Sequence, residues 1–244
     1  MAPGIKIRSL LAVAAIAAIA LTAAPAYADT ALTPHKAQYK VKISVFGGQL
    51  NTQLATTPDG YVATHSIKTT GMARMLARGE INESSRFGRV PSGIRPETFE
   101  SNDTLSRGGI QTSIRFDWSA GTASGTVNDE DFNSAMDDLA YDRVSIQYEL
   151  MSDMMNDGPS KTYVLFDVDE LKTVEVRTIG TRTVKVPAGE YEAIGLEHQA
   201  VGSKRITTMW CVQALDYLPV IIEQHRKGDL KMRAVLISYS PIKT

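Results

Sequence analysis

The sequence predicts a mainly β fold: a single antiparallel, strongly curved sheet that forms a barrel or half-barrel, with one main α-helix in the middle of the chain. Three observations predict it. Apolar and polar residues alternate along many short segments, turn-forming residues separate those segments at close intervals, and one longer segment has helical periodicity instead. The short connections favour antiparallel pairing, because parallel strands need long crossovers. We expect this arrangement in one domain over residues 29–244.

The first expected strands form a meander. Ala37, Tyr39 and Val41 share one face of the first strand, and lysines occupy the opposite face. The expected strands and turns follow one another directly: strand 36–45, turn or bulge 47–48, strand 49–56, turn 58–60 and strand 61–69.

Strand-like character returns on both sides of the expected helix. Residues 71–79 break the pattern and predict one or two helical turns, and Pro91, Gly93 and Pro96 predict a loop. The last two strands predict a hairpin. The remaining expected strands cover residues 99–106, 109–118, 122–127, 161–168, 173–180, 181–186, 191–201, 205–212, 219–225 and 230–239.

The main helix is expected over residues 134–156. Ser134 and Asp137 have the spacing of a capping box, and Gly158-Pro159 ends the segment. Tyr148 lies beside the apolar stripe of the helix. The stripe consists of Ala140, Val144, Gln147, Met151 and Met155.

The first 28 residues predict a secretory signal peptide cleaved after Ala28. Lys6 and Arg8 precede an apolar run of 12 residues, and Ala26-Tyr27-Ala28 has the pattern of a cleavage site. The run is too short to span a bilayer, so an uncleaved anchor is the weaker alternative. We therefore expect a periplasmic or secreted protein that is not transmembrane.

Composition excludes several classes of protein. The 244 residues contain 26 basic and 27 acidic residues, for a formal net charge of −1, which argues against a nucleic-acid partner. Cys211 is the only cysteine, so an intramolecular disulfide cannot form. We interpret Cys211 as a packed core residue, with a reactive thiol as the alternative.

No catalytic, metal or cofactor motif stands out. The sequence lacks G-x-S-x-G, H-E-x-x-H, a P-loop and G-x-G-x-x-G, so we predict no catalytic residues, no metal and no cofactor. His198 and His225 could meet across strands, but no ligand spacing supports a zinc site. The acidic residues near 129–138 are expected to be solvated and to cap the helix.

Five residues are candidates for lining an apolar groove. The helix contributes methionines, which adapt to varied apolar ligands, and the two tryptophans lie on expected strands. Packing in the core is the alternative interpretation for all of them. The candidates are Trp118, Tyr148, Met151, Met155 and Trp210.

Several segments together resemble the bacterial family called domain of unknown function 3108 (DUF3108). The segments occur in the family's order and span most of the chain: residues 93–99, 116–118, 137–150, 186–191 and 210–220. The resemblance implies an exported envelope protein of mostly antiparallel strands with one helix. It implies no established reaction and no catalytic residues. Similar curved sheets occur in periplasmic lipoprotein carriers, which is an analogy of fold.

The leading hypothesis is a non-catalytic binding or envelope-maintenance protein of the periplasm. A curved sheet covered by a methionine-bearing helix can enclose an apolar groove for a lipid, a lipoprotein acyl chain or an extended peptide. One alternative is a structural or partner-docking protein that uses an exposed strand edge. Another is a hydrolase acting on envelope glycan or lipid, which would need carboxylates or a Ser/His pair converging in one cleft.

Overall fold

The computed structural model describes residues 31–43, 46–71, 78–90, 93–136, 138–156, 158–167 and 170–243. The expected signal peptide lies outside these residues, as do residues 72–77 of the helical turns expected over 71–79. The strands are β1 (His35–Ile43), β2 (Phe46–Thr57), β3 (Gly60–Thr69), β4 (Glu80–Val90), β5 (Gly93–Asp103), β6 (Ile110–Asp117), β7 (Thr122–Val127), β8 (Glu130–Ala135), β9 (Ala140–Tyr141), β10 (Thr162–Asp167), β11 (Glu170–Val186), β12 (Gly189–Ala200), β13 (Arg205–Val212), β14 (Leu218–Arg226) and β15 (Asp229–Pro241). The helices are α2 (Ser145–Met155) and the 3-10 turn η1 (Gln213–Leu215).

All of these strands belong to one sheet. Its order is β8-β7-β6-β5-β4-β3-β2-β1-β15-β14-β13-β12-β11-β10-β9, and it is not closed into a complete barrel. The pairing of β1 with β15 joins the two halves of the chain at the centre, where Tyr39 lies opposite Leu236. Neighbours pair antiparallel except for β9 and β10, which pair in parallel. The prediction of a mainly β, strongly curved antiparallel sheet with one main helix is therefore confirmed.

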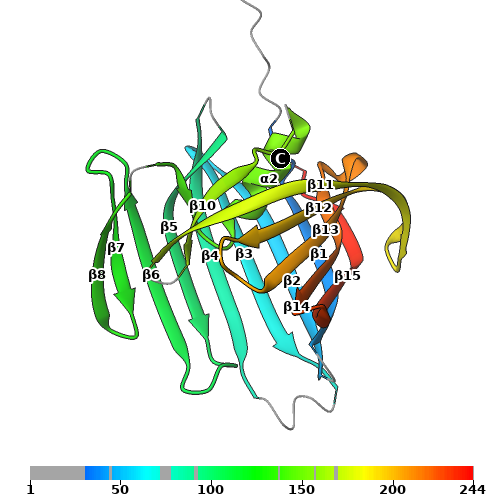
Figure 1. Ribbon diagram of the computed structural model, residues 1–244, viewed down its shortest axis with the longest axis horizontal. Helices are drawn as coiled ribbons and strands as arrows, with labels where there is room; N and C mark the ends of the chain where they lie inside the picture. Colours follow the sequence, from blue (N-terminus) through cyan, green and yellow to red (C-terminus); the bar gives the residue numbers. More distant parts are fainter. Residues whose placement is uncertain are drawn as a thin grey trace, which may run out of the picture.

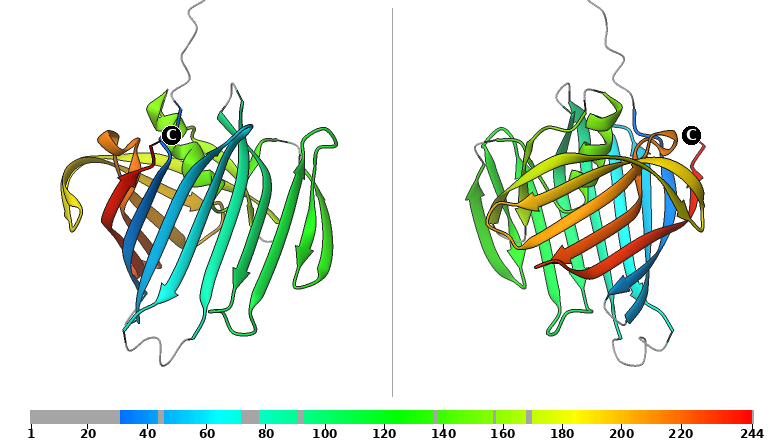
Figure 2. Two further views of the ribbon diagram at one scale, coloured as in Figure 1. Left: turned by 180° about the vertical axis from the view of Figure 1, so that it is seen from behind. Right: turned by 45° about the vertical axis from the view of Figure 1, so that its right-hand side comes forward.

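The sheet must curl because its two outermost strands are consecutive in the sequence. Ala135 ends β8 and Ala140 begins β9, so at most about 18 Å of extended chain separates them. A flat sheet of 15 strands would place those edges about 67 Å apart, at about 4.8 Å per strand. The sheet instead folds into two layers, with β2–β5 behind β10–β13 in Figure 1, β7 and β8 at the left edge, and the layers crossing in Figure 2.

Helix α2 lies at one end of the space between the layers (Figure 1) and contacts chiefly β5 and β4. Val144, Tyr148 and Met151 are buried in a core that also receives side chains from both halves of the sheet. The core residues from the two halves include Tyr39, Leu54, Phe87, Phe99, Phe166, Leu196, Leu218 and Leu236. The helix therefore packs inside the curl.

The expected start of the helix was wrong. Strands β8 and β9 occupy residues 130–135 and 140–141, and α2 begins at Ser145. The Asp142 carboxylate accepts hydrogen bonds from the backbone N–H groups of Val144 and Ser145, each at 2.8 Å, and the Ser145 hydroxyl accepts one from the Asp142 N–H. These bonds start the helix eight residues after Asp137, which lies outside the described residues.

Three other expectations also differ from the structure. Residues 80–90 form β4, for which the apolar pattern gave no signal, and β5 begins at Gly93 inside the expected loop. Gly47 and Gly48 lie within β2 and do not end a strand. The segments 173–180 and 181–186 are one strand, β11, whose pairing with β12 shifts between Thr178 and Thr181. The expected hairpin of β14 and β15 is confirmed.

Gly125 on β7 provides a test of how tightly the sheet is packed. A Cβ atom at this position would overlap the carbonyl oxygen of Ser113 on β6. We expect Gly125→Val to lower the free energy of unfolding by about 1–3 kcal/mol, because the backbone must shift to accept the side chain. Urea unfolding followed by circular dichroism measures this. Ser124→Val, on the opposite face of β7, is the control, and equal midpoints for the two variants would contradict the expectation.

Candidate functional site

A row of polar side chains crosses the inner face of the first half of the sheet. Register places Thr52 opposite His65, His65 opposite Glu83, Glu83 opposite Ser101, and Ser101 opposite Thr112. These residues alternate in phase with buried apolar residues of the same strands, so they point to the interior. We call this row the inner polar belt: Thr52, His65, Glu83, Ser101 and Thr112.

The residues that begin α2 connect the helix to the belt. The Arg143 guanidinium forms an ion pair with Glu83 at 2.8 Å and donates a hydrogen bond to the Ser101 hydroxyl at 3.2 Å. The Asp142 carboxylate accepts a hydrogen bond from Ser85, which neighbours Glu83 on β4, at 2.6 Å. The helix is therefore held against β4 and β5 by charged groups as well as by apolar packing.

Glu149 also holds the helix against the sheet, and the position of its carboxylate requires a glycine at residue 93. Its carboxylate accepts hydrogen bonds from the backbone N–H of Ile94 at 2.8 Å and from the Tyr141 hydroxyl at 2.7 Å. A Cβ atom at Gly93 would overlap that carboxylate, and the φ of Gly93 is +125°, which other residues rarely adopt. The first glycine of the segment 93–99 is thus explained by the docking of the helix.

Tyr148 of α2 lies among two histidines and a phenylalanine. Its ring centroid is 6.3 Å from that of His35, 6.4 Å from that of His65 and 5.6 Å from that of Phe87. Burial lowers the pKa of His65 to about 4 and lowers the pKa of His35, and it raises the pKa of the Tyr148 hydroxyl. All three groups are therefore neutral at pH 7, when they can donate or accept hydrogen bonds but carry no charge.

Several buried polar atoms around this cluster lack a hydrogen-bond partner within the described residues. Leaving such a group unsatisfied costs about 1–3 kcal/mol. The atoms are His35 Nε2, Thr52 Oγ1, His65 Nε2, Thr112 Oγ1 and the Tyr148 hydroxyl. They lie on or beside the inner polar belt, so this interior surface has unused hydrogen-bonding capacity.

The two carboxylates nearest the belt have perturbed acidities. Burial raises the pKa of Glu83, and the Arg143 guanidinium opposes that rise. Burial also raises the pKa of Asp142, against the hydrogen bonds that it accepts from Ser85 and from the start of α2. Both carboxylates are occupied in holding Arg143 and the helix, which leaves neither as an evident general acid or base.

An apolar row lies next to the belt on the same inner face, at the end away from α2. Leu50 lies opposite Ile67 and Ile67 opposite Ile81. Ile110 extends the row on β6, beyond Asp103, whose carboxylate accepts hydrogen bonds from the backbone of the following turn. We call Leu50, Ile67, Ile81 and Ile110 the apolar rim.

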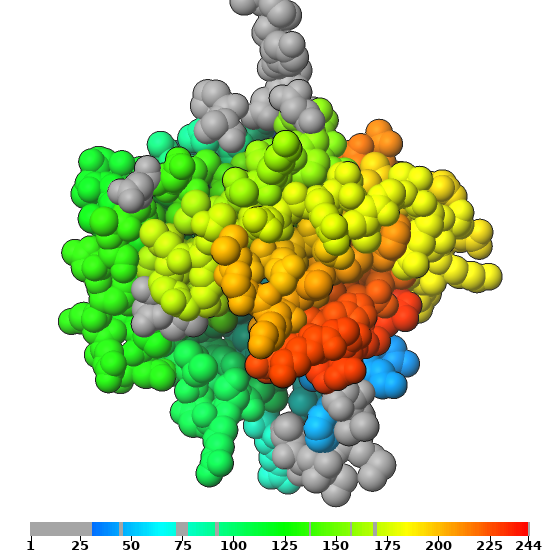
Figure 3. Space-filling model, viewed as in Figure 1, coloured from blue at the N-terminus to red at the C-terminus, as the bar shows by residue number. Residues whose placement is uncertain are grey.

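The apolar rim is only partly covered. Leu50, Ile67 and Ile81 are half-buried and Ile110 is 36% exposed, whereas core residues of the same strands, such as Leu54 and Phe87, are fully buried. The lower ends of β2–β6 extend past the front layer in Figures 1 and 3. The inner surface thus changes from polar to apolar toward an end that solvent reaches.

The five expected groove residues do not form one cluster. Tyr148 and Met151 are buried on α2, and Met155 is half-buried and packs against the core. Trp118 donates a hydrogen bond to the Pro96 carbonyl at 2.6 Å and stacks on Phe116. The Arg182 guanidinium covers the Trp210 ring at 3.7 Å, and Gly195 lies directly opposite Trp210. Trp210 thus points away from the inner face that carries its neighbour Met209.

Other candidates from the sequence are placed as follows. His198 pairs with Thr207 while His225 pairs with Ile206, so the two histidines are not opposite each other. No group of three metal-ligating side chains occurs within the described residues. Cys211 is buried, which raises the pKa of its thiol to about 12 and keeps it protonated.

No described helix is long and apolar enough to cross a membrane.

Sequence reasoning missed the inner polar belt, although one signal was present. Thr52 and His65 occupy the inward phase of strands that were expected, because they alternate with Leu54 and Ala63. A polar residue at an inward position indicates either a satisfied core group or a binding site. That signal could have been read before the register was known, whereas the contact with Tyr148 could not.

Comparison with known proteins agrees with the architecture. A family model described as "Protein of unknown function (DUF3108)" matches residues 35–235, which confirms the resemblance. The structure of a β-barrel-like protein of the domain of unknown function DUF1849, from Brucella abortus, is similar, with a TM-score of 0.60, 12% identity and coverage of 87% of this chain and 99% of that chain. A Bacteroides fragilis protein described as exported, with a YmcC-like fold, has a TM-score of 0.33, 11% identity and coverage of 86% and 97%. No curated protein matches the sequence.

Acid should weaken the fold through His65. Because its pKa falls from 6.5 in the unfolded chain to about 4 in the folded protein, its contribution is complete above about pH 6.5 and is lost as the pH falls toward 4. We expect the free energy of unfolding to drop over this range, by about 3 kcal/mol for this one group. His35 and His198, whose pKa values are also lowered by burial, act in the same direction.

His65→Gln is neutral at every pH, so it should flatten this dependence in urea titrations between pH 4 and 7. Ser66→Gln, on the outer face of the same strand, should keep the full slope. A wild-type slope in His65→Gln would show that His65 is not neutral and buried in the folded protein.

Proposed function

Because the chain belongs to the DUF3108 family of proteins of unknown function, we propose that it is an exported, non-catalytic binding protein of the cell envelope. The proposed ligand is an amphiphile with an apolar chain, such as a lipid or a lipoprotein acyl chain, held on the inner face of the curled sheet. Export is supported by the signal-peptide pattern of residues 1–28, with cleavage after Ala28, and the mature chain is proposed to be a single domain over residues 29–244.

The adjacency of the inner polar belt and the apolar rim carries the proposal. Thr52 and Leu50 are two residues apart on one strand face, as are His65 and Ile67, so the two rows run side by side. An amphiphile placed along this surface would bring its polar end to the unpartnered atoms of the belt and its apolar chain to the rim. Burying the chain against the rim would contribute about 25 cal/mol per Å² of apolar area.

One residue that contacts the inner polar belt is itself exposed. Arg143 contacts Glu83 and Ser101 of the belt, yet its side chain remains 37% exposed. The proposed path of the ligand runs along the apolar rim, whose outermost residue Ile110 is 36% exposed, from the end opposite α2. In this arrangement α2 is a fixed plug, held by Asp142, Arg143 and Glu149, and the groove is built mainly by the sheet.

The alternatives have less support. Glycan or lipid hydrolysis would require free carboxylates in one cleft, but Glu83 is paired with Arg143 and Asp142 holds Ser85 and the helix. Docking of a partner strand to the edge strand β8 is disfavoured by Glu130 and Asp131, since charged residues on an edge oppose pairing.

Saturable binding of a fluorescent fatty acid to protein purified without detergent tests the proposal. We expect Ile67→Lys to weaken binding at least tenfold, because it places a charge in the apolar rim. Val201→Lys, at an apolar loop residue that is 64% exposed, is the matched control and should bind as the wild type does. Absence of saturable binding by the wild type, or equal binding by the two variants, would refute the proposal.

Thr52→Val separates a binding role of the belt from a structural one. The substitution keeps the shape and removes a buried hydroxyl that has no partner within the described residues. We expect the unliganded protein to become more stable by about 1 kcal/mol, while its affinity for the fatty acid falls. Thermal unfolding and fluorescence titration measure the two effects. A gain in stability with unchanged affinity would exclude the Thr52 hydroxyl from the binding site.

A further inference from the structure

The outer face of the same strands carries a row of uncharged amide and hydroxyl side chains. Register aligns them one per strand across β15, β1, β2, β3, β4, β5 and β6. We call them the amide row: Ser238, Gln38, Asn51, Ser66, Asn82, Asn102 and Gln111. At about 4.8 Å per strand, this row is about 29 Å long. It lies on the face seen from behind in the left view of Figure 2.

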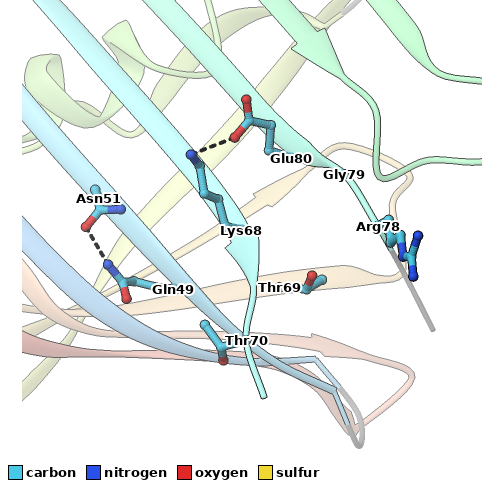
Figure 4. A pocket seen from close by; sticks show the side chains of 8 residues that line it. All are labelled: Gln49, Asn51, Lys68, Thr69, Thr70, Arg78, Gly79 and Glu80. Carbon is cyan, nitrogen blue, oxygen red and sulfur yellow. Dashed lines mark hydrogen bonds and ion pairs between the residues drawn. The ribbon is translucent and has the colours of Figure 1, made fainter. Parts of the chain in front are cut away.

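Three surface hollows run along the amide row and share residues. The first, of about 660 Å³, is lined by Gln49, Asn51, Lys68, Thr69, Thr70, Arg78, Gly79 and Glu80 (Figure 4). Asn51 also lines the second hollow, of about 340 Å³, beside Gln38 and Ser238. Ser66 lines the second hollow and the third, of about 640 Å³, which continues to Asn82, Asn102 and Gln111. The hollows therefore form one continuous track.

Charged residues of both signs line this track, Lys36, Lys68 and Arg78 together with Glu80 and Glu100, and some of them are paired. Lys68 and Glu80 form an ion pair at 2.8 Å, and Asn82 donates a hydrogen bond to the same glutamate (Figure 4 shows the pair). Glu100 accepts a hydrogen bond from Ser113 at 2.8 Å. Because the two signs are mixed along the track, neither an anion nor a cation would meet a surface of uniformly opposite charge, which favours an uncharged ligand.

Cross-strand ion pairs also occur on the outer face of the other half of the sheet. Arg177 pairs with Glu197 there, and Arg233 pairs with Glu223. Exposed strands commonly carry such charges, which favour solubility and oppose association. The amide row nevertheless places seven successive positions without a charge across β15 and β1–β6, where the hollows of the track lie.

We propose that the amide row binds a neutral glycan strand that bears hydroxyl and acetamido groups. An amide side chain donates and accepts at once, which matches both an acetamido group and a pair of sugar hydroxyls. Within the described residues, the side chains of Ser66, Asn102 and Gln111 make no hydrogen bond to protein, so they can bond to a ligand. An extended glycan crossing the strands presents sugar rings at a repeat close to the strand spacing.

This site is independent of the interior site. Residues of the amide row alternate with residues of the inner polar belt, so the two rows point to opposite faces of the sheet. Binding to the row would rest on hydrogen bonds and bridging waters, because the track lacks a tryptophan on which a sugar ring could stack. Affinity should therefore be low for a short sugar and increase with chain length.

The test is a titration of the full mature protein with chitohexaose, a neutral oligomer of N-acetylglucosamine, by calorimetry. We expect saturable binding that weakens at least tenfold in the double variant Asn82→Ala with Asn102→Ala, which removes two adjacent amides of the row. Gln213→Ala removes an exposed amide outside the row and should leave the affinity unchanged. Circular dichroism checks that both variants fold.

Absence of saturable chitohexaose binding at millimolar concentrations would overturn the proposal. Equal affinities of the double variant and the wild type would also overturn it, as would tighter binding of an anionic oligosaccharide than of chitohexaose. Fatty-acid binding by the double variant should match that of the wild type, so failure of this inference is distinguishable from failure of the interior site.

Discussion

The connection between the two edges of the sheet governs the rest of the structure. Strands β8 and β9 lie at opposite ends of a 15-stranded sheet, yet only residues 136–139 separate them in the sequence. The chain can satisfy this short connection only if the sheet curls and brings its edges together. The segment that leaves this junction becomes α2, so the helix necessarily begins at the mouth of the curl and packs inside it.

That position explains why the interior is partly polar. The residues that start α2 enter the curl together, and the buried carboxylate of Asp142 needs partners because an isolated buried charge is strongly unfavourable. Ser85 and Glu83 on β4 and Ser101 on β5 provide those partners for Asp142 and Arg143. The belt extends past them to Thr52 and Thr112, whose hydroxyls the helix does not reach. Docking the helix accounts for the centre of the belt, and its two ends require a different explanation, for which we propose a ligand.

The same polar interior limited what the sequence could predict. The strands β1 and β15 were predicted because their inward residues, such as Tyr39 and Leu236, are apolar. Strand β4 was not, because its inward positions include Glu83 and Ser85, which remove the apolar signal at period 2. The start of the helix was misplaced because Ser134 and Asp137 imitate a cap, whereas the cap at Asp142 depends on a fold that also buries this residue against β4.

The sequence identified individual residues of the candidate site but not their contacts with one another. Tyr148 was identified from its place beside a helical stripe, but His35 and His65 are more than eighty residues away in sequence and meet it only through the register of β1–β3 with the helix inside the curl. A tertiary contact of this kind leaves no local pattern. For Trp118 and Trp210 the sequence left both a groove and core packing open, and the structure packs Trp118 on Phe116 and against the core and places Trp210 within the core beneath Arg182.

The inner polar belt and the amide row constrain one another through strand register. Thr52, His65, Glu83 and Ser101 are each the sequence neighbour of a residue in the row: Asn51, Ser66, Asn82 and Asn102. A slip of one residue in any of these strands would exchange the two faces, placing amides in the interior and the belt in solvent. The contacts of Glu83 and Ser101 with Arg143 oppose that slip on β4 and β5, the strands that carry Asn82 and Asn102 of the amide row. The docking of α2 therefore fixes which face each row occupies, including the outer row that the helix never touches.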